Sequence, residues 1–270
     1  MRAIYRVARA TFHEAWRRRF LNIFLVFGIL IIGSSWVFAY LQPGAELKMI
    51  IDVSLGSIRF FGMLIAVFMG TRLIPDEIEK RTIHTILTKP VSRAEFLFGK
   101  FLGGIATIFA NVALMGAAFF IVYAIKAPQF RAMTTEGAMS MEFMAGNIVK
   151  AVMLSFFELT VLMSIAVVAS TVFSWIVAAI FSFFVYFVGQ MAEFFNQLAN
   201  PERDIPAIAK ALLGVIYKLL PHFEIFDIRE AIMRDQFMPW NVMGKIVAQG
   251  LAYTLIVMLI GYLIFNDREV

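Results

Sequence analysis

Cysteine is absent from this chain of 270 residues, and charged residues make up only 16% of it. The absence of cysteine excludes a disulfide framework, a thiolate metal site and a cysteine nucleophile. A soluble domain is about half apolar and about a quarter charged. Here 61% of the residues are hydrophobic, 29 are Phe, and the mean hydropathy is +0.81. The composition therefore indicates an integral membrane protein.

Five apolar runs are long enough to cross a bilayer, which takes about 20 mostly apolar residues. One run, 151–192, is about twice the thickness of the hydrocarbon layer, so it should form two crossings joined by a turn at Ser170–Ser174. The sequence thus predicts an all-α integral membrane protein, with residues 1–270 forming a single transmembrane domain. The expected spans are 20–41, 50–74, 96–125, 148–170, 174–195 and 245–265.

An even number of spans places both termini on the same side of the membrane. Cytoplasmic segments carry an excess of Lys and Arg near the ends of spans, and the arginine-dense segments lie before the first span and between the second and third. We therefore expect both termini in the cytoplasm of a bacterial or archaeal cell, in its plasma membrane, with outer segments at 126–147 and 196–244. The charges that set this orientation are Arg2, Arg6, Arg9, Arg17, Arg18, Arg19, Arg72, Lys80, Arg81, Lys89, Arg93, Lys100 and Arg268.

The N-terminal segment, 1–19, has a helical charge pattern. Its basic residues recur at spacings of three and four, which places them on one helix face. A basic amphipathic helix of this kind lies along a membrane surface, so we expect an interfacial helix here. The alternative is a basic topology signal with no such structure. The residues on the basic face are Arg2, Arg6, Arg9, His13 and Arg17.

The two outer segments carry weaker signals. Residues 205–220 are too short and too charged for a confident span and fit an amphipathic helix lying on, or re-entering, the outer leaflet; a seventh span would move the C-terminus outside. Clustered thioethers bind Cu(I), but methionine is also a common gap-filler in apolar chains, which is the more frequent explanation. The outer methionines are Met133, Met139, Met141 and Met144.

Two charges, Arg59 and Glu158, lie at similar depths inside the second and fourth spans. An unpaired charge at mid-membrane costs about 2.5–3.5 kcal/mol, so both should face the protein interior, where they could pair. Such residues line or gate substrate paths, or they form an ion pair that only fixes the packing of the spans. Asn111 and Gln190 are further intramembrane polar candidates.

The segment between the second and third spans has strong helix signals. Pro75 suits the first turn of a helix, and the acidic residues that follow it complement the helix dipole. This helix, 75–88, must end before Pro90. Ser92 and Glu95 then form a capping box that starts the helix leading into the third span.

A short helix held at both ends by spans forms a rigid protrusion that a cytoplasmic partner could bind. The alternative is an ordinary basic loop that only fixes the topology. The residues expected to make the docking surface are Asp76, Glu77, Ile78, Glu79, Lys80, Arg81, Thr82, Ile83, His84, Ile86 and Leu87.

The same segment resembles the signature of type-2 ABC exporter permeases. The resemblance rests on Glu79-x-Arg81-Thr82, Leu87, Pro90-Val91-Ser92-Arg93 and Gly99-Lys100. Arg81 replaces the usual Gly, and Ile86 replaces the first Leu of a pair; neither change disturbs a helix. "LLPHFEIFDIRE", residues 219–230, is similar to a stretch of the permeases linked to the maturation of multi-copper enzymes.

The resemblance implies that 75–88 is the coupling helix of an exporter, which docks on a separate ATP-binding subunit. It implies two such subunits, with ATP and Mg bound there, and a second permease subunit in a homo- or heterodimer. This chain itself has no P-loop, because its Gly-Lys pairs are followed by Phe101 and Ile246. We expect no enzyme activity, cofactor, metal or nucleic acid on this chain, whose environment is the lipid bilayer. The alternative is a non-transporting subunit that passes ATPase motion to an envelope complex or a signalling partner.

Overall fold

In a computed structural model of the chain, residues 2–79, 92–131, 141–198, 206, 212–215, 217–218, 220–234 and 236–267 are described. Helices dominate these residues, and no β-strand occurs among them. The elements are α1 (Arg2–Trp16), α2 (Arg19–Ala39), α3 (Glu46–Arg72), α4 (Pro75–Glu79), α6 (Arg93–Arg131), α7 (Met141–Val172), α8 (Trp175–Gln190), α9 (Ala192–Leu198), the 3-10 helix η1 (Phe223–Phe226), α11 (Arg229–Met233) and α12 (Trp240–Asp267).

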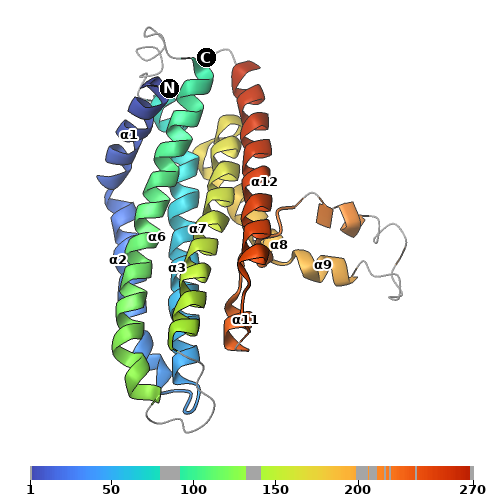
Figure 1. The fold of residues 1–270 in the computed structure, drawn as a ribbon. Helices are drawn as coiled ribbons and strands as arrows, with labels where there is room; N and C mark the ends of the chain where they lie inside the picture. Colours follow the sequence, from blue (N-terminus) through green and yellow to red (C-terminus); the bar gives the residue numbers. More distant parts are fainter. Residues whose placement is uncertain are drawn as a thin grey trace.

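The long helices α2, α3, α6, α7 and α12 run side by side in one bundle, and α1 begins at the end of the bundle where α12 finishes (Figure 1). Within the described ranges, five helices are long and apolar enough to cross a membrane. The pair α8 and α9, which is bent by 55°, makes a sixth if it counts as one span. The predicted all-α, multi-pass fold class is therefore confirmed, with a break between α8 and α9 inside the fifth predicted span, 174–195.

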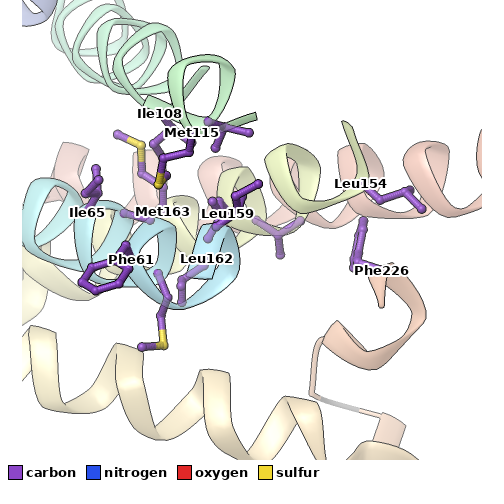
Figure 2. Packing of buried hydrophobic residues seen from close by; sticks show 14 of the residues in the cluster. Phe61, Ile65, Ile108, Met115, Leu154, Leu159, Leu162, Met163 and Phe226 are labelled. Atoms are coloured by element: carbon purple, nitrogen blue, oxygen red, sulfur yellow. The ribbon is translucent and has the colours of Figure 1, made fainter. Parts of the chain in front are cut away.

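The centre of the bundle is the contact between α3 and α7. In the apolar membrane-spanning stretch of each of these helices, 72% of the residues are buried inside the protein, against 22% in α2 and in α12. Small residues allow the backbones of spanning helices to approach closely, and a Cβ on Gly62 or Gly70 of α3 would clash with Leu159 or Ala166 of α7. Figure 2 shows this core, with Phe61 and Leu159 among its labelled residues.

The N-terminal helix α1 packs lengthwise against the beginning of α6. Two glycines of α6 make this possible, because a Cβ on Gly99 would meet Val7 and a Cβ on Gly103 would meet Thr11. Arg9, on the opposite face of α1, is exposed, as is Arg17 just after the helix ends. At the start of α6 the expected capping box is present: the backbone N–H of Glu95 donates to the Ser92 hydroxyl at 3.2 Å, and the Ser92 N–H donates to the Glu95 carboxylate at 3.1 Å.

Between α9 and α12 the chain folds back against the bundle. Residues 220–228 return to the middle of the bundle and pack on α8, where a Cβ on Gly189 would meet the carbonyl of Pro221 and the ring of Phe223. Phe226 and Val161 of α7 both lie against Gly250 of α12, and Figure 2 draws Phe226 near Leu154 of α7. Non-helical backbone at this depth is tolerated only where protein or water covers it, and both Phe223 and Phe226 are buried.

Several predicted features lie outside the described residues or partly so. The helix expected at 75–88 is described only as α4, so its continuation from Lys80 onward is not placed. Most of 205–220 is likewise outside the described ranges. The turn expected at Ser170–Ser174 contains the break between Val172 at the end of α7 and Trp175 at the start of α8.

Candidate functional site

A bidentate ion pair joins α3 to α7 at the centre of the bundle. Arg59 donates from Nε to Glu158 Oε2 at 2.8 Å and from Nη2 to Glu158 Oε1 at 2.7 Å. Arg59 is 6% exposed and Glu158 is fully buried. Arg59 lies about 20 Å along the helix from Arg72, which stacks on Trp175 at the start of α8. Because the hydrocarbon core is about 30 Å thick, the pair lies well inside the membrane.

Helix α8 supplies two more donors to the same carboxylate. The hydroxyl of Tyr186 donates to Glu158 Oε1 at 3.1 Å, and the side-chain amide of Gln190 donates to it at 2.7 Å. Four hydrogen bonds therefore satisfy Glu158, as a carboxylate at this depth requires. These hydrogen bonds connect α7 with the last two turns of α8.

Asp227, between η1 and α11, lies between two guanidinium groups. One of its oxygens is in contact with Nη1 of Arg59, and Arg229 donates to its two oxygens at 3.0 Å and 2.7 Å. Arg229 also pairs with Asp52 of α3 at 3.3 Å. Burial alone would raise the pKa of Asp227, but the hydrogen bonds from Arg229 and the charge of Arg59 hold that pKa below its ordinary value.

These groups form what we call the Arg59 cluster: Asp52, Arg59, Glu158, Tyr186, Gln190, Asp227 and Arg229. A pocket of about 270 Å³ adjoins the cluster. Its polar lining comes from Arg59, Arg229, Tyr186 and Gln190, and its apolar lining from Gly56, Phe60, Met63 and Phe187. Phe60 and Phe187 are both about half exposed, so the pocket opens on the surface of this chain between α3 and α8.

A second charged group, the Lys100 cluster, joins α1, α4 and α6. The ammonium of Lys100, which is 6% exposed, lies 2.5 Å from a Glu77 carboxylate oxygen and 3.7 Å from one of Glu14. Arg18 pairs with Glu14 at 3.0 Å and with Asp76 at 2.7 Å. The start of the predicted coupling helix is thus held by ion pairs to the helices on both sides of it.

The structure brings together three of the four intramembrane residues singled out in the sequence: Arg59, Glu158 and Gln190. Asn111 is buried elsewhere, where its amide donates to the backbone carbonyl of Thr107 on the same helix at 2.8 Å. Of the expected docking residues, Asp76 and Glu77 join the Lys100 cluster, and Ile78 and Glu79 are helical. The remaining ones lie outside the described residues: Lys80, Arg81, Thr82, Ile83, His84, Ile86 and Leu87.

The sequence interpretation missed several members of both clusters. Asp227 and Arg229 lie in the quoted stretch 219–230, where an acid and a base two residues apart beside buried aromatics were a usable signal. Tyr186 was another signal, as a hydroxyl one turn from Gln190 in an otherwise apolar run.

No set of three His, Asp or Glu side chains is placed to hold a metal within the ranges that are described. Of the outer methionines, Met144 is buried in the core. Met133 and Met139 fall outside those ranges, and the side chain of Met141 is not described.

A multi-pass helical fold with charges buried at its centre is typical of membrane transport proteins. Residues 33–270 match the sequence profile of the ABC-2 family transporter proteins, so the chain belongs to this family. It is 33% identical over 120 residues to the probable ABC transporter permease protein NosY of Stutzerimonas stutzeri, with 43% of each chain covered. The NosY protein of Pseudomonas aeruginosa is 32% identical over 143 residues, covering 51% of this chain and 52% of that protein.

The chain thus spans about half the length of the curated relatives it matches. The resemblance noted from residues 77–100 is confirmed at the level of the family, and the chain is an ABC-2 permease subunit of an ABC transporter.

Proposed function

We propose that this permease belongs to an ATP-driven exporter, in which hydrolysis by a separate subunit moves a substrate across or out of the membrane. The Lys100 cluster is the observation that carries the proposal. It ties the first turn of the coupling helix to α6 through Glu77 and to the end of α1 through Asp76 and Arg18. A force applied to the segment after α4 would therefore reach two neighbouring helices through ion pairs that are largely shielded from solvent.

The expected assembly contains two ATP-binding subunits, which carry the ATP and Mg, and a second permease subunit of the same or a different chain. We place both termini in the cytoplasm of a bacterial or archaeal cell. Two observations support this orientation: the described ends of the chain share one end of the bundle, and exposed arginines of α1 lie at that end.

The substrate path should pass the pocket beside the Arg59 cluster. A pocket lined by guanidinium, amide and phenol groups is costly to leave open to lipid. The face between α3 and α8 is therefore expected to meet the second permease subunit or a water-filled space rather than acyl chains. The two half-exposed rings, Phe60 and Phe187, border this opening.

Docking of the ATP-binding subunit is tested by Ile83→Asp and by Arg81→Glu, which alter the coupling segment beyond α4. Both variants should lose co-purification with the ATP-binding subunit. Arg234→Glu is the matched control, since Arg234 is an exposed residue of the segment before α12 that pairs with Glu230 one turn away. If the two coupling-segment variants still bind the subunit and keep hydrolysis coupled, the docking proposal is wrong.

Transport itself is tested with the complete complex in liposomes. ATP-dependent movement of a substrate supports the exporter. ATPase activity that never produces flux, with any candidate substrate, would instead support the alternative of a subunit that passes mechanical motion to another envelope protein.

A further inference from the structure

Asp227 differs from the other carboxylates of the Arg59 cluster in where it comes from. Glu158 and Asp52 are carried by the long helices α7 and α3. Asp227 lies in the irregular connection between η1 and α11, in the segment that returns to the middle of the bundle. It is thus the one acidic member of the cluster that a movement of this connection would withdraw.

Arg229 follows Asp227 by two residues and bonds it through its backbone N–H and its guanidinium, but Arg229 is also held to α3 by Asp52. A local movement that withdraws the Asp227 carboxylate while this second contact persists would leave an ordered pair of donors, because Arg59 would keep its bidentate partner Glu158 and Arg229 would keep Asp52. Both guanidinium groups line the adjoining pocket and would retain N–H groups that point to the place that Asp227 now occupies. An arginine at this depth that loses a partner attracts another anion, because its desolvation is otherwise uncompensated.

We propose that this place is an anion-binding site of the substrate path, with Asp227 as the internal group that a substrate's anionic head displaces. The inference rests on the proposed transport function. Arg59 and Arg229 would bind the head, and Phe60, Met63 and Phe187 would contact an apolar remainder. The substrate class is a small amphipathic organic anion, such as a carboxylate or a sulfonate. The pocket, at about 270 Å³, is near the lower end of the range for small-molecule sites.

Because the chain has no cysteine, a single introduced cysteine supplies the only thiol that a labelling reagent can modify. Gly56 lines the pocket, and a Cβ there would approach Arg229 no closer than 3.5 Å, so Gly56→Cys should be tolerated. The full chain carrying this cysteine, in phosphatidylcholine nanodiscs, is labelled with a thiol reagent in the presence of hexanoate. Hexanol and hexylammonium serve as neutral and cationic probes of the same length.

Asp227→Asn removes the internal anion without changing its size. Hexanoate should then protect the cysteine at about tenfold lower concentration than in the wild-type background, the factor expected for one charge-assisted hydrogen-bonded contact. Glu230→Gln, which removes an exposed carboxylate that pairs with Arg234 outside the cluster, should not produce this gain. Equal protection by hexanol or hexylammonium, or no gain in Asp227→Asn, overturns the proposal.

The wild-type background decides the question if Asp227→Asn does not fold: saturable protection by hexanoate and none by hexanol supports the site, and no protection overturns it. Oleate in the nanodisc, tested against hexanoate, distinguishes a carboxylate that enters from the lipid from one that enters from water. The labelling experiment does not depend on the ATP-binding subunit. If hexanoate gives no protection while the ATP-binding subunit still docks as proposed, only the anion site is refuted. If hexanoate protects the cysteine but the docking test fails, only the proposed coupling to the ATP-binding subunit is refuted.

Discussion

Exchanging the charges of Arg59 and Glu158 should fail to restore the protein, although the two residues form a direct pair. Their surroundings are not equivalent. The acidic side chain of Asp227 contacts Arg59, whereas Tyr186 and Gln190 donate hydrogen bonds to Glu158. In the exchanged protein a glutamate would face Asp227, and an arginine would face two groups oriented as donors.

The magnitudes follow from what each single change leaves behind. Arg59→Met leaves the buried Glu158 without its cation, for which removal of one partner costs about 3–5 kcal/mol. Glu158→Gln should cost less, about 1.5–3 kcal/mol, because Arg59 keeps Asp227. The neutral double variant Arg59→Met with Glu158→Gln should lose less than the sum, since residues in contact couple by about 0.5–3 kcal/mol. The charge exchange should be the least stable of the four.

The free energies of unfolding are measured by reversible denaturant titration of the chain in mixed micelles. Exchange of the exposed pair Arg234 and Glu230, one turn apart, is the control and should change stability by less than about 0.5 kcal/mol. A charge exchange at Arg59 and Glu158 that is as stable as the wild type would refute the reasoning. It would mean that the stability of the pair does not depend on its neighbours, and that Asp227, Tyr186 and Gln190 do not determine which position carries the positive charge.

Three further changes test the rest of the structure. Lys100→Met removes the cation that lies 2.5 Å from the buried Glu77. It should lower the stability by about 3–5 kcal/mol and reduce ATPase coupling, while exposed Lys245→Met leaves both unchanged; equal effects would contradict the role of the cluster. Gly103→Leu should detach α1 from α6 and raise proteolysis of the N-terminus, whereas Gly33→Leu, where the space is open, should not. Asp227→Asn should lose stability at neutral pH, and the difference should shrink as the pH falls from the ordinary range of an aspartate through the lowered pKa of Asp227; a pH-independent difference would show that charge is not involved.

The number and type of spans could be predicted because lipid imposes a simple length and composition rule. The rule is weakest for the fifth predicted span, 174–195, where no local signal indicates that α8 ends at Gln190 and that α9 is bent by 55° from it. No proline or glycine pair marks the break. Its physical reason is tertiary: the connection bearing Pro221 and Phe223 packs against Gly189, which is a contact between residues about 30 positions apart in the chain.

The Arg59 cluster could be predicted only in part for a similar reason. Charges inside spans are conspicuous, so Arg59 and Glu158 were visible as candidates. Asp227 and Arg229 lie in a mixed polar segment, where charge is ordinary, and nothing local indicates that this segment returns to the depth of Arg59. The Lys100 cluster was hidden for another reason, because Lys100 was counted among the charges that set the topology.

Helix α3 connects the two clusters. It carries Arg59, and with the turn at Leu73–Ile74 it continues into α4, so that an apolar helical stretch extends from Glu46 to Glu77. Arg59 and Glu77 are about 27 Å apart along this stretch, and α3 is the most buried of the spans together with α7. A close-packed helix resists bending and moves as a unit. A shift imposed on α4 should therefore reach Arg59 without an intermediate conformational switch. The contact of Arg59 with Asp227 should respond first, because Asp227 lies in the connection between η1 and α11 and not on one of the long helices.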